Sequence, residues 1–334
     1  MSKLSFSSFQ DNPNKKRLRE DWNTPFLRYI HDKYNIKYRY MGFPGTDLID
    51  IILWKDMIEE VIAFELLAPG YDYRIWVKRL RANLSKLGIR SIAYLGSFEE
   101  VVILGKDYEN QPYKQNKVIT LYNLDFCDEI GSSIETLERG KKVLRYEAIR
   151  LILRDQKQCF QQTGEPSYFV ILLTIRNQID ASKIKGFLSS SNLLAETSSY
   201  CSSCERINPI PENGPLVGTH AWSLKAFLYD TLIGYFKNPN ISTIFFPIVK
   251  YYGRSKSSPM FHWMMFCKFG FEESANPNFY PAQYLETVNS LCVDSSGINI
   301  KFEPGEIENN SQDLSPVGWF QQFESLFSSN GRLV

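Results

Sequence analysis

The stretch "IKYRYMGFPGTDLIDIILWKDMIEEVIAFE", residues 36–65, predicts how the fold begins. Its first part, 36–44, is aromatic and alternating, as a strand is, and runs into a turn with two glycines and a proline. Thr46 suits the N-cap of a helix in the apolar segment that follows. Because that segment is apolar on more than one stripe, we expect the helix to lie buried against a sheet. Residues 61–65 then predict a second strand.

Glu65, at the end of that second strand, follows Gly45 by 20 residues. In nucleotide-binding βαβ units the helix runs back along the sheet, so that the second strand returns its tip beside the first turn. There a carboxylate can accept hydrogen bonds from ribose hydroxyls, and glycines such as Gly42 and Gly45 let a ligand approach the backbone. The stretch therefore indicates a nucleotide site, or else a structural βαβ unit whose turn binds nothing.

The alternation of strands and helices continues to residue 176. The sequence predicts helices at 73–88 and about 135–162, strands at 91–96, 118–126 and 167–176, and a further strand-like segment at 99–105. Helices placed between apolar strands favour a parallel sheet that is covered on both faces.

The second half of the chain is less regular. Residues 189–215 are rich in Ser, Asn, Pro and Glu and predict a loop, whereas 221–236 has the spacing of an amphipathic helix. Residues 242–253 and 259–271 predict a pair of strands, and 318–327 predicts a short docking helix.

These elements predict an α/β fold of the Rossmann-like type: a mainly parallel sheet with helices on both faces and an antiparallel C-terminal strand pair. We expect an N-terminal arm and lead-in helix in 1–35 and the α/β domain in 36–275, with 189–215 as an irregular insertion. Residues 276–334 are expected to form an extension that docks on this domain.

Composition favours a cytoplasmic protein. The 334 residues carry a formal net charge of +1, which gives no general case for binding nucleic acid or membrane. No apolar run approaches the roughly 20 residues that span a bilayer, and the polar N-terminus lacks the apolar centre of a signal peptide. We interpret the basic cluster at 15–19 as a solvated arm.

The six cysteines are too few for a disulfide scaffold in a chain of this length. Cys201 and Cys204 form one CxxC pair, half of a usual zinc site, so the prediction is two free thiols and no bound metal. Cys127 is not expected to be a nucleophile, because the acids that follow it would raise its pKa. His262, among apolar neighbours, is interpreted as a core histidine.

The segment "NLDFCDEI", 123–130, has the densest chemistry in the sequence. It ends an apolar strand, and in an open α/β sheet the carboxyl ends of the strands line the ligand crevice. Asp125 could accept a proton or a hydrogen bond from a substrate, and Phe126 could stack on a planar one. The alternative is a strand end whose acids face water.

In the order of its elements, the region of about 36–270 resembles the class I S-adenosylmethionine-dependent methyltransferases. "GFPG" resembles that family's cofactor loop, Glu65 its ribose-binding acid, and "LYNLDFC" at 121–127 its strand-end motif beside the methyl group. The resemblance implies that S-adenosylmethionine is the cofactor and that nucleic acid or protein is the methyl acceptor. It also implies two sets of site residues: for the cofactor Gly42, Gly45, Glu65 and Gly96, and for catalysis Asn123, Asp125 and Phe126.

The sequence departs from that family just before the first glycine, where Arg39, Tyr40 and Met41 stand in place of the usual acid. This departure favours an alternative, a catalytically inactive methyltransferase-fold protein that serves as a binding or scaffold subunit. Either form would suit a prokaryotic defence system. A dinucleotide-dependent oxidoreductase is a weaker third hypothesis, because the sequence has no GxGxxG.

The loop between the two C-terminal strands predicts one further contact surface. Basic and aromatic side chains alternate there, a combination that can contact phosphate and stack on bases. The residues are Lys250, Tyr251, Tyr252, Arg254 and Lys256. A solvated hairpin tip is the alternative, and a protein partner is also compatible with the sequence.

Overall fold

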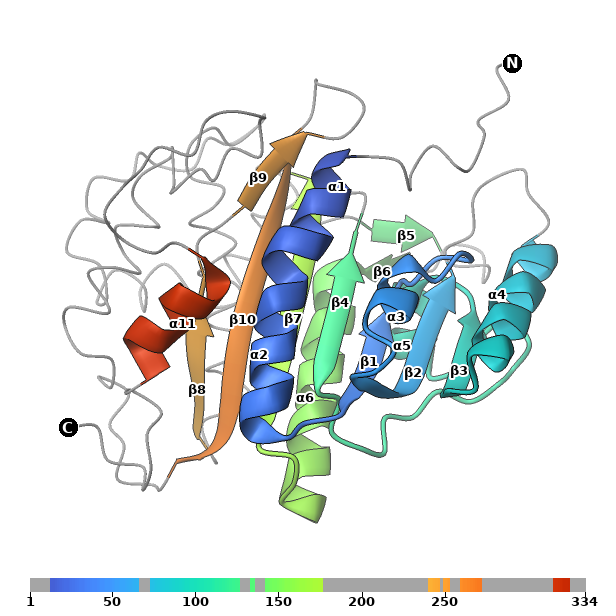
Figure 1. Cartoon of the computed structure of the whole chain (residues 1–334). Helices are drawn as coiled ribbons and strands as arrows, with labels where there is room; N and C mark the ends of the chain where they lie inside the picture. The colour runs from blue at the N-terminus through green and yellow to red at the C-terminus, as the bar shows by residue number, and fades with distance from the viewer. Residues whose placement is uncertain are drawn as a thin grey trace, which may run out of the picture.

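The computed structural model describes residues 13–65, 73–126, 133–135, 142–176, 240–246, 249–252, 259–271 and 315–324 (Figure 1). The predicted loop at 189–215 and helix at 221–236 lie outside the described residues, as do Cys127, Cys201 and Cys204. Within the described part, no helix is both long and apolar enough to cross a membrane.

The strands of the main sheet follow the order β3-β2-β1-β4-β7-β10-β8, and β9 pairs with β10. Their bounds are β1 Tyr38–Gly42, β2 Ile58–Glu65, β3 Arg90–Leu95, β4 Leu121–Asp125, β7 Tyr168–Arg176, β8 Asn240–Phe245, β9 Val249–Tyr252 and β10 Pro259–Phe271. Strands β3, β2, β1, β4 and β7 are parallel to their neighbours in this series. β10 is antiparallel to β7, β8 and β9. The fold class predicted from the sequence is confirmed.

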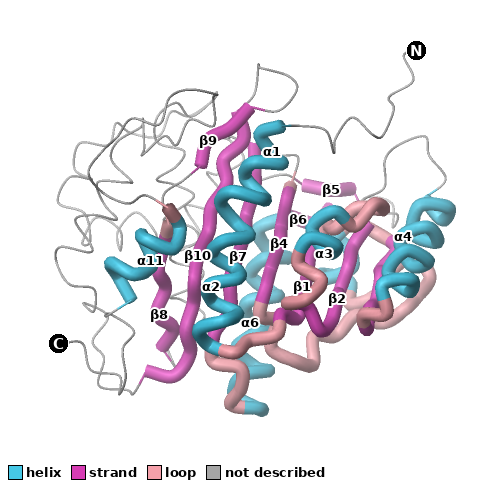
Figure 2. The backbone as a smooth tube through the Cα atoms, in the orientation of Figure 1, coloured by secondary structure: helices cyan, strands magenta, loops and turns pink. Residues whose placement is uncertain are grey.

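Helices lie on both sides of this sheet (Figure 2). Their bounds are α1 Pro13–Arg17, η2 Leu18–Asn23, α2 Thr24–Tyr34, α3 Ile49–Leu53, α4 Tyr73–Leu87, α5 Phe98–Leu104, α6 Arg145–Thr163 and α11 Pro316–Phe323. Of these, η2 is a π-helix that links α1 to α2. A short antiparallel pair, β5 Ser133–Glu135 and β6 Lys142–Leu144, precedes α6.

Two buried clusters explain how the sheet is covered. Side chains of α2, α3, α4 and α11 pack on one face, against residues that include Tyr40, Leu121 and Leu172. Those of α5 and α6 pack on the other face, where Tyr122 and Leu173 point. Because both faces are buried, the central strands are apolar at successive positions rather than at alternate ones.

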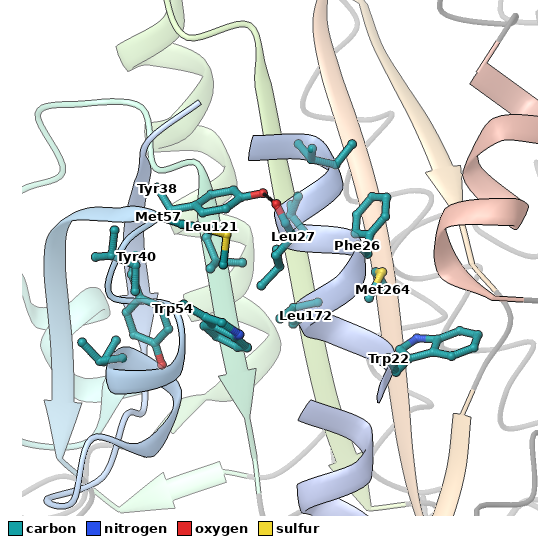
Figure 3. Packing of buried hydrophobic residues seen from close by; sticks show 14 of the residues in the cluster. Trp22, Phe26, Leu27, Tyr38, Tyr40, Trp54, Met57, Leu121, Leu172 and Met264 are labelled. Carbon is teal, nitrogen blue, oxygen red and sulfur yellow. Dashed lines mark hydrogen bonds between the residues drawn. The ribbon is translucent and has the colours of Figure 1, made fainter. Parts of the chain in front are cut away.

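Figure 3 shows how α2 is held on the first of these faces. Trp22, Phe26 and Leu27 point toward the sheet, and the Tyr38 hydroxyl donates a hydrogen bond of 2.6 Å to the Leu27 carbonyl oxygen. Phe26 also packs edge-on against Phe320 of α11, with ring centroids 5.6 Å apart. The C-terminal helix therefore docks on α2, within the predicted extension.

Three local predictions were wrong. Thr46 is not the N-cap of the helix after the glycine turn, because α3 begins at Ile49 and its N-cap is Leu48, which makes no side-chain capping hydrogen bond. The strand-like segment 99–105 is helix α5, because Ser97 caps its N-terminus: the Ser97 hydroxyl oxygen accepts from the Glu100 amide at 3.2 Å and donates to the Glu100 carboxylate at 3.1 Å. The long helix predicted from about 135 begins only at Arg145, because the residues before it pair as β5 and β6.

Candidate functional site

The strand registers bring the predicted site residues to one edge of the sheet. Gly42, the last residue of β1, pairs with Ala63 on one side and with Asn123 on the other. Glu65 and Asp125 lie two residues further along their strands, so both belong to the carboxyl edge and point to the same side of the sheet. With one strand between them, their Cα atoms are separated by about 10 Å.

This edge is also where the connections change face. The helices that follow β1 and β2 lie on one face and those that follow β3 and β4 on the other. The change occurs between β1 and β4, and in open α/β sheets ligands bind at such a switch point. Figure 1 shows α1 beside the same edge, near the tip of β4.

The glycine turn has a structural explanation at both glycines. A Cβ at Gly42 would lie 2.0 Å from the backbone oxygen of Asn123, so the missing side chain lets β1 and β4 approach each other. Gly45 has φ +63°, a left-handed conformation that glycine adopts without strain, and its carbonyl accepts from the Leu48 amide at 3.3 Å. Neither observation requires a ligand at the turn.

Unlike the two glycines, Glu65 has no structural explanation in the described part of the chain, because no described group there neutralises its carboxylate. No described group interacts with its carboxylate, and burial alone raises its pKa from 4.5 to about 7. Glu65 forms a bridge with Gly96 at the end of β3, where φ is +148° and a Cβ would lie 3.0 Å from Val101. Glu65 thus has no partner among the described residues and lies beside a backbone position that favours glycine.

Asp125 is held from the N-terminal helix. The Lys15 ammonium donates to Asp125 Oδ2 at 2.6 Å, and the two side chains are 19% and 32% exposed. The other carboxylate oxygen, Oδ1, is buried and has no hydrogen-bond partner in the described structure. Asp125 therefore has one oxygen neutralised and one buried oxygen able to accept.

Asn123 connects β4 to α3 and β1. Its amide nitrogen lies 2.8 Å from a carboxylate oxygen of Asp50 and 3.2 Å from the Tyr40 hydroxyl. The other oxygen of Asp50 pairs with Arg19, from η2. The amide donor of Asn123 is thus used within the protein. Tyr40 occupies one of the positions where an acid is usual, while the nearby acid, Asp50, comes from the next helix.

Beyond Asp125, polar side chains continue across the sheet onto β7 and β10. Thr174 pairs with Asp125 on one side and with His262 on the other. His262 is fully buried, and its Nδ1 and Nε2 lie 2.9 Å from the Thr174 hydroxyl and 3.0 Å from Asn23 Oδ1. Burial lowers the pKa of His262 to about 4, so it is neutral at physiological pH. The interpretation of His262 as a core histidine agrees with this geometry.

Phe126 points to the opposite face of the sheet and is part of the core. Its ring packs against Phe43 and Phe98, with centroids 5.1 and 5.8 Å away, and the Arg145 guanidinium lies 4.3 Å from its centre. Arg145 in turn pairs with the buried Glu99 at 2.7 Å. These contacts occupy the ring, so stacking of Phe126 on a planar substrate has no support here.

The predicted surface around β9 is only partly described. The Tyr251 side chain is 2% exposed and lies in the core, which argues against base stacking by this residue. Lys250 and Tyr252 belong to β9, but their side chains are outside the described part, as are Arg254 and Lys256. No group of three or more potential metal ligands occurs among the described residues.

The sequence interpretation missed the helix that reaches into this edge. Lys15, Arg19 and Asn23 recur every four residues and contact Asp125, Asp50 and His262 respectively. Lys15 and Arg19 are therefore not part of a solvated arm, and that prediction was wrong for these two. The four-residue spacing was the available signal, because residues at i and i+4 share one helix face.

No protein-family model and no curated protein sequence matches the chain. Among solved structures it is similar to an S-adenosylmethionine-dependent methyltransferase from Clostridium acetobutylicum, at 8% identity over 75% of this chain and 92% of that chain, with a TM-score of 0.37. It is also similar to an O-methyltransferase from Bacillus cereus in complex with SAH, at 11% identity over 76% and 86% of the two chains, with a TM-score of 0.35.

A third match is M. jannaschii TYW2 in complex with AdoMet, at 11% identity over 80% of this chain and 78% of that chain, with a TM-score of 0.34. Independently of these values, the sheet has the expected parallel strands, the helices on both faces and the antiparallel β10 next to β7 and β8. The chain thus has a Rossmann-like α/β fold.

Proposed function

We propose that the chain binds S-adenosylmethionine at the carboxyl edge between β2 and β4 and transfers its methyl group to a nucleic-acid or protein acceptor. The observation that carries this proposal is Glu65. A partly buried carboxylate with no described partner, next to a glycine at the tip of the neighbouring strand, fits a ligand that offers two hydroxyl donors. A ribose offers two such donors side by side.

The chain's own residues then have separate tasks. Glu65 would accept the ribose hydroxyls, and these hydrogen bonds favour its ionised form. Asp125 lies at the tip of β4, with Oδ1 able to accept a hydrogen bond or proton from the acceptor group. Asn123 would hold this strand end through Asp50 and Tyr40. S-adenosylmethionine, when bound, supplies an already activated methyl group, so alignment provides much of the rate.

One observation favours the alternative, a methyltransferase-fold subunit without catalysis. The Lys15 ammonium lies on Asp125, where the acceptor would be held. The usual acid before the first glycine is also absent. In this alternative the edge binds a ligand, or nothing, and the protein acts through its surface.

Calorimetric titration with S-adenosylmethionine and S-adenosylhomocysteine tests the proposal. Glu65→Ala should weaken binding about 10- to 150-fold, because hydrogen bonds to a charged acceptor are worth about 1.5–3 kcal/mol. Glu59→Gln is the matched control: Glu59 is also on β2, but it is exposed and pairs with Arg39 away from the edge. Its affinity should equal that of the wild type.

Catalysis is tested separately with Asp125→Asn and methyl-labelled cofactor, by following label in nucleic-acid and protein fractions. We expect reduced transfer with little change in cofactor affinity. A wild-type protein that binds neither compound at millimolar concentration would refute cofactor binding. Binding without transfer to either fraction would instead support the inactive subunit.

A further inference from the structure

We propose that residues 13–19, here called the gate segment, form a gate over the carboxyl edge that is closed by Lys15 and Arg19. The proposal rests on the proposed function for what the gate admits, namely a ligand at Glu65 and Asp125. The closure itself rests on contacts within the chain.

The two inward cations bind acids on different elements. Lys15 contacts Asp125 at the end of β4, and Arg19 contacts Asp50 on α3. The acids belong to opposite sides of the switch point, since β4 leads to one face of the sheet and α3 covers the other. The gate segment therefore ties together the two sides of the edge at which we place the ligand.

The neighbouring cations of the same segment face outward. Lys16 pairs with Glu20 at 3.9 Å and Arg17 with Asp21 at 3.8 Å, both within the helix, and the Lys16 side chain is 65% exposed. By contrast the Lys15 and Arg19 side chains are 19% and 16% exposed. All four residues are cations, so charge does not explain why two are exposed and two are not. The difference in exposure follows the helix face that each residue occupies.

The gate segment and the residues after it are held in different ways. From residue 22 onward the helix is anchored by apolar burial, with Trp22, Phe26 and Leu27 packed on the sheet (Figure 3). Within 14–19, Leu18 is the buried apolar side chain in the described structure. The closed position of the gate segment thus depends more on polar contacts, which can be exchanged for contacts with a ligand or water.

The π-helix between these two parts provides a hinge. In η2 the Thr24 amide donates to the Arg19 carbonyl, five residues back rather than four. Such a segment holds one extra residue, so its conversion to α-helix would rotate the preceding turn by about 100°. That rotation would carry Lys15 off Asp125 and Arg19 off Asp50 together, and both carboxylates would become accessible.

Carboxylate footprinting tests this coupling without any ligand. The protein is treated with a carbodiimide and an amine reagent, and labelling of Asp50 and Asp125 is measured by mass spectrometry. We expect Lys15→Met to speed the labelling of Asp50, the ion-pair partner of Arg19, and Arg19→Met to speed that of Asp125, the partner of Lys15. The increase should be roughly three- to tenfold, which corresponds to a coupling between the two contacts of about 0.7–1.4 kcal/mol.

Lys16→Met is the matched control and should label like the wild type, and Asp56, exposed and paired with Arg28, serves as the internal reference. Labelling confined to the direct partner of each mutated residue would overturn the proposal, because it shows two independent ion pairs. An equal increase in labelling of all carboxylates in a variant, Asp56 included, would also overturn it, because such an increase indicates general unfolding.

Stopped-flow binding of S-adenosylhomocysteine supplies the second arm. Lys15→Met should increase its association rate by a factor similar to that in footprinting. A slower association or a weaker affinity would overturn the gate, because Lys15 would then be part of the binding site. Failure of every variant to bind would refute the proposed function alone, and footprinting would still decide the gate.

Discussion

Replacement of Glu65 by glutamine should stabilise the ligand-free protein, because the wild-type carboxylate is desolvated and unpaired within the described structure. Burial raises its pKa from 4.5 to about 7. Each tenfold change in an ionisation constant corresponds to 1.36 kcal/mol, so ionising this group in the folded state costs about 3 kcal/mol more than in the unfolded chain. Glu65→Gln removes that cost and keeps the shape of the side chain.

The effect should depend on pH in a defined window. Between pH 4.5 and about 7, the folded protein keeps the proton on Glu65 that the unfolded chain has already lost. Stability falls with pH wherever the folded state binds more protons, so this group's favourable contribution is complete below pH 4.5 and is lost by about pH 7. The variant and the wild type should therefore be equally stable at pH 4.5, and the variant more stable at pH 8.

Urea unfolding at pH 4.5, 6 and 8, with both proteins at each pH, measures the difference directly. We expect the advantage of Glu65→Gln to grow from near zero to about 2–3 kcal/mol, while the exposed control Glu59→Gln shows no such trend. An advantage that is the same at all three pH values would refute the reasoning. A variant that is more stable but binds S-adenosylmethionine less well would show that the Glu65 carboxylate lowers the stability of the folded protein and serves ligand binding.

Three further predictions concern the residues around this edge. His262→Gln should remove the part of the wild-type stability that is lost as pH falls from 6.5 to 4, and urea unfolding at pH 5 and 7 will contradict this if the two proteins share one pH slope. Gly42→Ala should lower the free energy of unfolding by about 2–4 kcal/mol, because its Cβ meets backbone that cannot move aside easily; a loss below 1 kcal/mol would be inconsistent with that contact. Arg145→Met should cost about 3–5 kcal/mol by leaving Glu99 buried and unpaired, and adding Glu99→Gln should recover part of it; no recovery in a double-mutant cycle would exclude this cause.

The fold was predictable because its signals are local. Glu65 ends one apolar run and "NLDF" ends another, so neighbouring residues alone identify each strand and its carboxyl end. Parallel strand–helix–strand units then bring those ends to one edge. The signal that contradicts the strand prediction for α5 is local too: the apolar run of 101–104 is typical of a strand, but Ser97 before it is an N-cap that starts a helix.

The roles of single side chains were less predictable because they depend on which face of a strand each one occupies. Asp125 and Phe126 are neighbours in the sequence, but one points to the edge contacted by Lys15 and the other into the aromatic cluster around Phe98. The interpretation treated them as one motif. Alternation along a strand separates them, and the register that decides which one faces the site comes from the pairing of β4 with β1.

The N-terminal cations show why overall charge says little about such an edge. Lys15 and Arg19 are separated from their partners by 110 and 31 residues, so nothing near them in the sequence identifies the acids that they neutralise. With the gate segment closed, Asp50 and Asp125 are compensated and the charge of Glu65 is suppressed by burial. With the gate segment open, the same edge would present uncompensated carboxylates. A positively charged ligand would then replace the cations of the gate segment, and opening and binding would favour each other through the same two acids.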